Sequence, residues 1–198
     1  MERLLEVMRR LRAPDGCPWD KEQTHLSLRP YMLEEAAEAV DAMSKGDPDE
    51  LAEELGDVLL QVAFHSVIAE QEGTFSYSQV EGHIVDKLIR RHPHVFGGVK
   101  ADTPEEVSAN WRVIKAGEGK GRASVCDEVP RSLGALARAA EIQKKLEAPL
   151  ASPGDVISAL EKGDLAEALW QMVALCRREK VNPEILLREK CDRNCSKP

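Results

Sequence analysis

The chain has 198 residues, enough for one large domain or for one domain with a small companion. Hydrophobic residues make up 42% and charged residues 31%, a balance typical of a globular protein. Its formal net charge of -8 argues against a general nucleic-acid-binding surface, because such surfaces are basic, although a local basic cluster can still bind phosphate. No apolar run approaches the roughly 20 residues of a membrane span, and the N-terminal MERLLEVMRRLR lacks the apolar core of a signal peptide. We therefore expect a soluble, cytoplasmic protein that binds neither nucleic acid nor membrane.

Helical periodicity recurs along nearly the whole chain, whereas runs with the two-residue period of a strand are missing. We predict an all-α fold, a helical bundle without significant sheet. The expected helices cover residues 2–12, 29–45, 48–71, 77–91, 103–116, 131–147, 155–162, 164–179 and 182–190. Between the first two, residues 13–28 are rich in turn formers and connect them.

The sequence GEGKG at residues 117–121 is the clearest linker. We place a domain boundary there, which divides the chain into residues 1–118 and a helical segment of residues 119–198. The two parts share a faint internal repeat. The segment ELGDVLLQVAFHSVIA, which begins at Glu54, aligns with DLAEALWQMVALCRRE, which begins at Asp164. Amphipathic helices also match in this way by chance, so both explanations stay open.

Two pairs of acidic residues, each three apart, lie on consecutive predicted helices: Glu35 with Glu38, and Glu54 with Asp57. The turn between the helices is short, so they should run antiparallel and can bring the four carboxylates together. Four such groups would raise one another's pKa unless a cation lay between them, and oxygen ligands favour Mg²⁺ or Mn²⁺. Both pairs are expected to border the core-facing sides of their helices. Those sides consist of Leu33, Ala36, Ala37, Val40 and Met43, and of Leu51, Leu55, Val58, Leu59 and Val62.

The sequence also allows other interpretations of these acidic pairs. A solvated acidic face explains the spacing about as well. A di-iron centre is poorly supported, because it requires Glu-x-x-His pairs and His65 lies too far along its helix. Cys191 and Cys195 supply only two of the four ligands of a zinc site, so we interpret the CDRNC segment as a frayed tail.

Basic and aromatic residues downstream suit a polyphosphate. Lys87 and Arg91 lie four apart near the end of one predicted helix, and Trp111 and Lys115 share a face of the next. Basic side chains can hold phosphate oxygens, and an indole can stack on a base. An ordinary basic last turn and a packed tryptophan are the simpler alternatives.

Five segments in order resemble the MazG family of nucleoside triphosphate pyrophosphohydrolases over residues 1–118. They are CPWDKEQTHLSL, YMLEEAAEAVDAM, LAEELGDVLLQVAFH, KLIRRHPHVFG and NWRVIK. The resemblance implies an all-α bundle, usually a tight homodimer, and we expect this chain to form a homodimer or a higher homo-oligomer. It also implies Mg²⁺-dependent hydrolysis of NTPs or dNTPs to the monophosphate and pyrophosphate, as in nucleotide-pool clean-up.

The resemblance also implies residue roles. The metal-binding positions of the family match Glu35, Glu38, Glu54 and Asp57, and Glu34 completes the motif. Glu38 or Glu35 is the candidate catalytic base. The phosphate- and base-contacting positions match Lys87, Arg91, Trp111 and Lys115.

The second half departs from the pattern of long family members. It lacks the first acidic pair, and its second pair is inverted to Asp164 and Glu167. We expect this half to be catalytically silent and to serve packing or dimerisation. A catalytically weak nucleotide-binding or regulatory module is therefore the alternative function, and the preferred base and sugar stay open.

Overall fold

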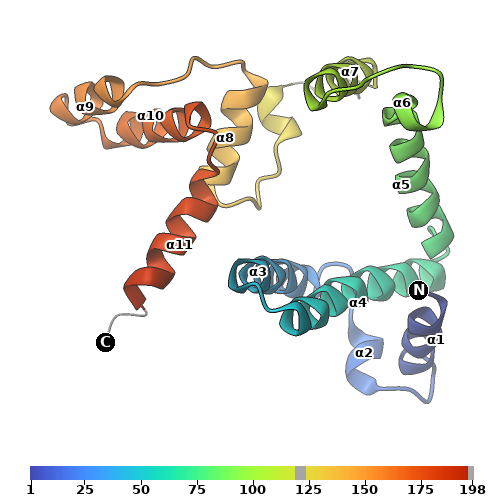
Figure 1. Ribbon diagram of the computed structural model, residues 1–198. Helices are drawn as coiled ribbons and strands as arrows, with labels where there is room; N and C mark the ends of the chain where they lie inside the picture. The colour runs from blue at the N-terminus through green and yellow to red at the C-terminus, as the bar shows by residue number, and fades with distance from the viewer. Residues whose placement is uncertain (119–123, 196–198) are drawn as a thin grey trace. The chain divides into compact units, whose positions relative to one another are not determined.

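The computed structural model describes residues 1–118 and 124–195, in which all regular structure is helical (Figure 1). The all-α prediction is therefore confirmed. The helices are α1 (Glu2–Leu11), α2 (Pro18–Glu22), α3 (Arg29–Lys45), α4 (Pro48–Glu72), α5 (Tyr77–Arg91), α6 (Pro93–Phe96), α7 (Pro104–Gly117), the 3₁₀ helix η1 (Val125–Glu128), α8 (Ala135–Lys145), α9 (Pro153–Glu161), α10 (Leu165–Arg178) and α11 (Pro183–Cys195).

Each predicted helix is present, with ends that differ by a few residues. The sequence did not reveal α2, α6 or η1, because four or five residues are too short to display a helical period. The prediction of a frayed tail at Cys191 and Cys195 was wrong, since α11 continues through both and both side chains are exposed. Of the predicted linker, residues 119–121 lie outside the described residues.

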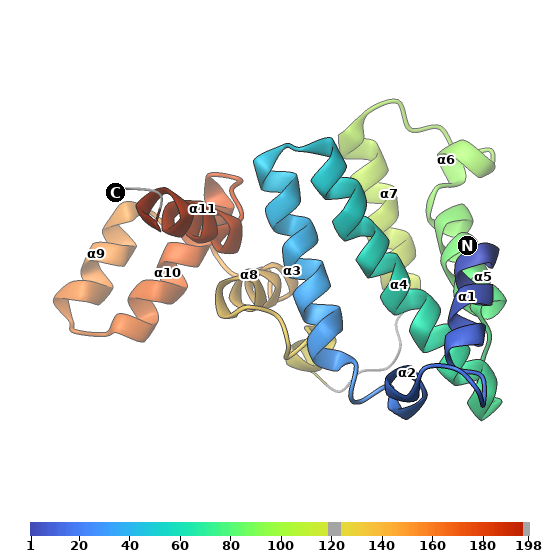
Figure 2. The same cartoon turned by 90° about the horizontal axis from the view of Figure 1, so that it is seen from below.

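The chain divides into two compact units, Met1–Lys115 and Ala116–Pro198. In the first unit α3 and α4 form an antiparallel hairpin (Figure 2). Gly46 ends α3 in the left-handed region with φ 76°, a conformation that glycine adopts without strain. The next residue, Asp47, caps α4 by accepting a hydrogen bond from the Asp49 backbone N–H at 2.9 Å. Because only two residues separate the helices, the end of α3 lies next to the start of α4.

The core of the first unit lies where α1 packs on the C-terminal half of α4. Its buried members are Leu5, Met8, Leu28, Ala63, Phe64, Val67 and Ile68. Arg12 fastens the connecting segment to this core, because its guanidinium donates to the Gln23 carbonyl at 3.1 Å and to Gln71 Oε1 at 2.8 Å. It also lies 5.6 Å from the centre of the Phe64 ring.

The predicted core-facing sides of α3 and α4 were wrong in part. Leu33 and Met43 are each 55% exposed, and Leu55 and Leu59 are 46% and 43% exposed. The residues of α3 that are buried are Ala39 and Ala42. A helical wheel identifies an apolar side but not which neighbouring helix covers it, and here α1 covers the C-terminal half of α4 and not the part that contains Leu55 and Leu59.

A histidine pair joins the segment before α3 to α4. The Nδ1 atoms of His25 and His65 lie 2.7 Å apart in a hydrogen bond, and their rings are stacked with centroids 5.0 Å apart. His25 also stacks on Phe75, and its Nε2 lies 3.6 Å from the Glu72 carboxylate. Burial, and then the charge of His25, lower the pKa of His65 below its ordinary value.

We expect acid to weaken the first unit through His65. Its pKa is lower in the folded than in the unfolded state, so the unfolded chain binds the proton more readily and stability falls as the pH drops below about 6.5. Urea unfolding of wild type and His65→Phe at pH 7.5 and pH 5.5 measures this. The variant should lose less stability between the two pH values, and an equal loss in both proteins would contradict the expectation.

The second unit is organised around Gln143, which is fully buried. Its Nε2 donates to the Trp170 carbonyl at 2.8 Å, and its Oε1 accepts from Arg177 at 3.3 Å. Both ends of the amide are thus satisfied, and they tie α8 to α10. The α9–α10 pair forms a second helical hairpin (Figure 2). In neither unit is a described helix both long and apolar enough to cross a membrane.

Candidate functional site

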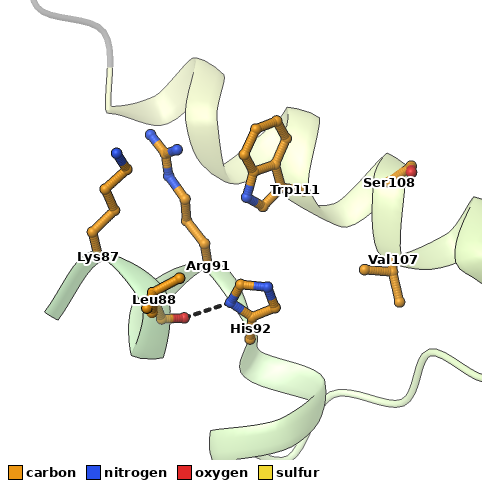
Figure 3. A pocket seen from close by; sticks show the side chains of 7 residues that line it. All are labelled: Lys87, Leu88, Arg91, His92, Val107, Ser108 and Trp111. Carbon is orange, nitrogen blue, oxygen red and sulfur yellow. Dashed lines mark hydrogen bonds between the residues drawn. The ribbon is translucent and has the colours of Figure 1, made fainter. Parts of the chain in front are cut away.

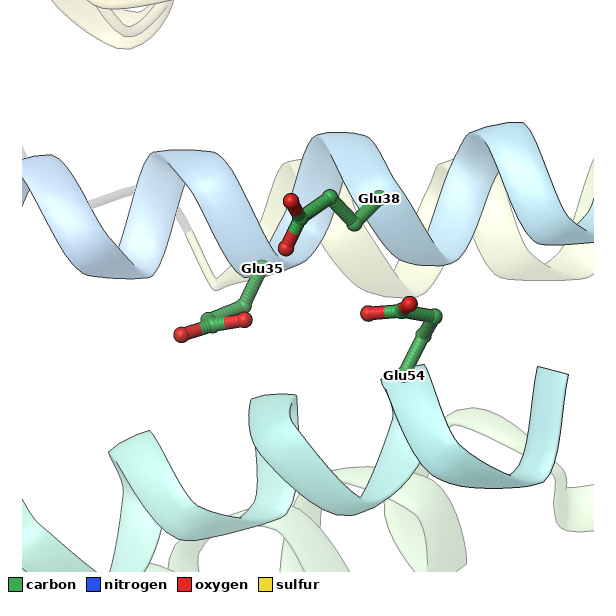
Figure 4. A group of neighbouring side chains, drawn as sticks. All are labelled: Glu35, Glu38 and Glu54. Carbon is green, nitrogen blue, oxygen red and sulfur yellow. The ribbon is translucent and has the colours of Figure 1, made fainter. Parts of the chain in front are cut away.

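Three carboxylates converge between α3 and α4. Glu35 and Glu38 come from α3 and Glu54 from α4, and they point toward one another (Figure 4). Each offers an oxygen atom, and these atoms lie within 4.8 Å of one another. The spacing of three residues places the two α3 side chains on one helical side, and the short turn places α4 opposite. Among the described residues this is the one group of three or more potential metal ligands so close together.

Two of these carboxylates, Glu35 and Glu54, resist ionisation because their pKa values are raised. Loss of solvation, followed by the charges of Asp57 and Glu38, raises the pKa of Glu35, while a hydrogen bond from Gln61 acts in the opposite direction. Loss of solvation and then the charges of Glu38 and Asp57 raise the pKa of Glu54. A cation among these oxygens would relieve the repulsion.

The structure thus brings together three of the four predicted metal ligands. Asp57 is half-buried and outside the cluster, but its charge raises the pKa of both Glu35 and Glu54. Glu34 is exposed. Oxygen-only donors that converge from two helices fit a hard divalent cation. The residues present therefore suit a hard divalent cation better than a softer metal, which would favour histidine or cysteine.

The predicted basic and aromatic residues meet between the end of α5 and the middle of α7. Here lies a pocket of about 310 Å³ (Figure 3). Its lining consists of Lys87, Leu88, Arg91, His92, Val107, Ser108 and Trp111. His92 Nδ1–H donates to the Leu88 carbonyl at 2.7 Å, which fixes its ring at the end of α5.

Trp111 forms the aromatic wall of this pocket. The Arg91 guanidinium carbon lies 5.2 Å from the centre of its ring, and Lys115 Nζ lies 5.3 Å from it. Both are cation–π contacts. The indole is 36% exposed, so it remains available for stacking on a planar ligand. Three of the four predicted substrate-binding residues line the pocket, and Lys115 contacts its tryptophan.

Two residues near these sites were not predicted from the sequence: Gln61 of α4, and His92, which directly follows α5. Gln61 is 4% exposed, and its Nε2 donates to Glu35 Oε1 at 3.5 Å. Its position four residues after Asp57, and so on the same helical side, was the available signal. His92 was visible only as the residue before Pro93 that ends α5.

The second unit uses its matching acidic residues differently. The Asp164 carboxylate caps α10 by accepting from the Glu167 backbone N–H at 2.9 Å. Glu167 Oε1 accepts from Gln171 Nε2 at 2.6 Å. Both residues line a polar pocket of about 480 Å³ that also contains Lys162. Their hydrogen bonds stay within α10, in contrast to the first unit, where carboxylates from two helices meet.

Comparison with known proteins gives consistent matches. The sequence model of a protein family, the MazG nucleotide pyrophosphohydrolase domain, matches residues 23–96. The nucleoside triphosphate pyrophosphohydrolase of Escherichia coli (strain K12) is 49% identical over 148 residues, which are 73% of this chain and 56% of that protein. The chain therefore spans little more than half the length of this relative.

A second relative covers more of the chain. The nucleoside triphosphate pyrophosphohydrolase/pyrophosphatase MazG of Thermotoga maritima is 38% identical over 95% of this chain and 80% of its own length. A crystal structure of a mazG-related protein from the same organism superposes with a TM-score of 0.50 at 28% identity. It covers 59% of this chain and 99% of its own.

Proposed function

Because the chain belongs to the MazG family, we propose that it hydrolyses nucleoside triphosphates, including deoxynucleoside triphosphates, to the monophosphate and pyrophosphate. The observation that carries the proposal is the convergence of Glu35, Glu38 and Glu54. The pocket between α5 and α7 supports it, because its cationic and aromatic side chains suit a nucleotide. As part of the proposal, the enzyme works in the cytoplasm and clears unwanted nucleotides from the pool.

Each side chain has a role in this proposal. Glu35, Glu38, Glu54 and Asp57 hold Mg²⁺, for which Mn²⁺ can substitute. When bound, the metal supplies polarisation of phosphate oxygens and a lower pKa for water. The attacking water is oriented and deprotonated by Glu38, which is open to solvent, or by Glu35, whose raised pKa favours proton uptake.

The pocket holds the rest of the substrate. Lys87 and Arg91 bind phosphate oxygens and stabilise the charge that develops on the departing pyrophosphate. The Trp111 indole stacks on the base, and Lys115 at the edge of the same ring adds a further positive charge. No nucleophilic side chain is needed, because water attacks the α-phosphorus directly.

We assign this activity to residues 1–118 and propose that residues 119–198 form a degenerate, catalytically silent second half. The hydrogen bonds of Asp164 and Glu167 within α10 support a packing role. A catalytically weak nucleotide-binding or regulatory module is the second candidate function. It is favoured by this loss of a second acidic site.

One assay separates these possibilities. The purified protein is incubated with a panel of NTPs and dNTPs and Mg²⁺, with EDTA as control, and pyrophosphate and orthophosphate are quantified. EDTA-sensitive release of pyrophosphate supports the proposal and reports the preferred base and sugar. Orthophosphate would indicate a different phosphohydrolase. Release of neither, with nucleotide binding retained in calorimetry, would favour the binding module.

We also propose that two copies of the chain associate through α3 and α4. Leu33, Met43, Leu55 and Leu59 of this hairpin expose 43% to 55% of their surface, and exposed apolar side chains on two adjacent helices are suited to burial in an interface. The family resemblance supports a homodimer or a higher homo-oligomer. Sedimentation velocity should give twice the 21.9 kDa of one chain, and Leu55→Glu should shift the protein toward monomer. A monomeric wild-type protein would contradict this.

A further inference from the structure

Gln61 is a buried polar residue on the side of α4 that faces α3. It is 4% exposed, and its Nε2 donates to Glu35 Oε1 at 3.5 Å. The other end of its amide, Oε1, is buried, and no described protein group donates to it. Gln143 of the second unit is also buried, and both ends of its amide are bonded. Gln61 thus differs from a glutamine that serves only to join helices.

A buried, half-satisfied amide lowers stability, because one polar atom has lost water without gaining a partner. An aliphatic side chain of similar length would fill the same space without this cost. A glutamine at this position therefore suggests a function outside folding. Its place beside Glu35 directs attention to the carboxylate cluster.

The internal repeat provides a comparison within the same molecule. Gln171 occupies in α10 the position that Gln61 occupies in α4, seven residues after the first acidic residue of each repeat. Gln171 is less buried, and its Nε2 bonds Glu167 of its own helix at 2.6 Å. Gln61 instead reaches across to α3. At this position of the repeat, the glutamine therefore contacts another helix only in the unit that retains the carboxylate cluster.

We propose that Gln61 is a positioning residue for the metal site. Its Nε2 holds the Glu35 carboxylate in the direction of Glu38 and Glu54, and its Oε1 accepts a hydrogen bond from water at the site. The inference rests on the proposed function, since it assigns a task at the same site. Partners that orient metal-binding side chains in this way typically change metal affinity or activity by 10–100-fold when removed.

The test compares Mn²⁺ affinity with stability. In Gln61→Met the side chain keeps its length but loses both polar ends. We expect Mn²⁺ to bind about tenfold more weakly, measured from the electron paramagnetic resonance signal of free Mn²⁺. The thermal midpoint in EDTA should be equal to or higher than that of wild type, because the unpaired carbonyl is gone. Gln171→Met is the matched control and should leave Mn²⁺ affinity unchanged. Gln61→Leu provides a second variant if the methionine disturbs packing.

Each outcome is decisive. Weaker Mn²⁺ binding with an undiminished midpoint supports the inference. Unchanged Mn²⁺ affinity in the Gln61 variants overturns it, as does a fall in midpoint large enough to explain the weaker binding through unfolding. If wild type released pyrophosphate while the variants kept its metal affinity, only the inference would fail. If wild type itself bound no Mn²⁺, the proposed function would fail with it.

Discussion

Replacement of Glu38 by glutamine is expected to abolish Mg²⁺-dependent pyrophosphate release, with a loss of at least about 100-fold in kcat. Glutamine keeps the shape of the side chain but removes its negative charge and its capacity to accept a proton. Glu38 is exposed on α3, so the helix should form normally without the carboxylate. Asp57→Asn should have the same effect, since Asp57 adds its charge to the field at Glu35 and Glu54.

The measurement is steady-state pyrophosphate release, together with circular dichroism to verify helicity. Glu167→Gln is the matched control, because it makes the same chemical change in the α10 counterpart of Asp57 and should leave turnover unchanged. Wild-type turnover in both Glu38→Gln and Asp57→Asn would refute the assignment of the metal site. Loss of activity in Glu167→Gln as well would show that the second unit takes part.

Arg91→Met is expected to raise KM for a nucleoside triphosphate by about 10–100-fold, because a charged hydrogen bond contributes about 1.5–3 kcal/mol. Arg91 lines the pocket and packs over Trp111 at 5.2 Å. Its removal takes away both a phosphate ligand and a support of the indole. Because a contact with departing pyrophosphate also acts in the transition state, kcat should fall as well, though by a smaller factor.

Arg90→Met makes the same change in charge one residue earlier in α5, at a position outside the pocket lining. It controls for the general loss of positive charge and should leave KM near the wild-type value. Initial rates over a range of substrate concentrations at constant ionic strength give both parameters. Equal KM values for the two variants would mean that the pocket between α5 and α7 does not bind the substrate.

The helices could be predicted from the sequence because their signals are local. The short turn between α3 and α4 was predicted from the sequence, and the structure has a left-handed glycine, Gly46, and a side-chain cap, Asp47, at this turn. The packing of these helices against one another could be predicted less well from the sequence. The apolar stripe of α3 that contains Leu33 and Met43 is largely exposed, because periodicity identifies an apolar side without specifying which partner covers it.

In the candidate site, too, the residues that could be predicted are those that depend on local spacing, and the residues that were missed depend on packing. Glu35, Glu38 and Glu54 were found because their separation along each helix, together with a short turn, nearly determines that they meet. Gln61 was missed, because its contact with Glu35 depends on how α4 is rotated against α3. The His25–His65 hydrogen bond joins residues 40 positions apart and depends on how the segment before α3 folds back. No local sequence pattern predicts a contact between residues so far apart in the chain.

The division into two units affects how heat is absorbed on unfolding. Met1–Lys115 and Ala116–Pro198 each form a compact unit, so a single melting temperature describes the chain only if both unfold together. Differential scanning calorimetry would otherwise resolve two endotherms. A metal that binds the first unit raises the midpoint of one endotherm through its binding free energy and leaves the other in place. The endotherm of Ala116–Pro198 then serves as an internal reference within every sample.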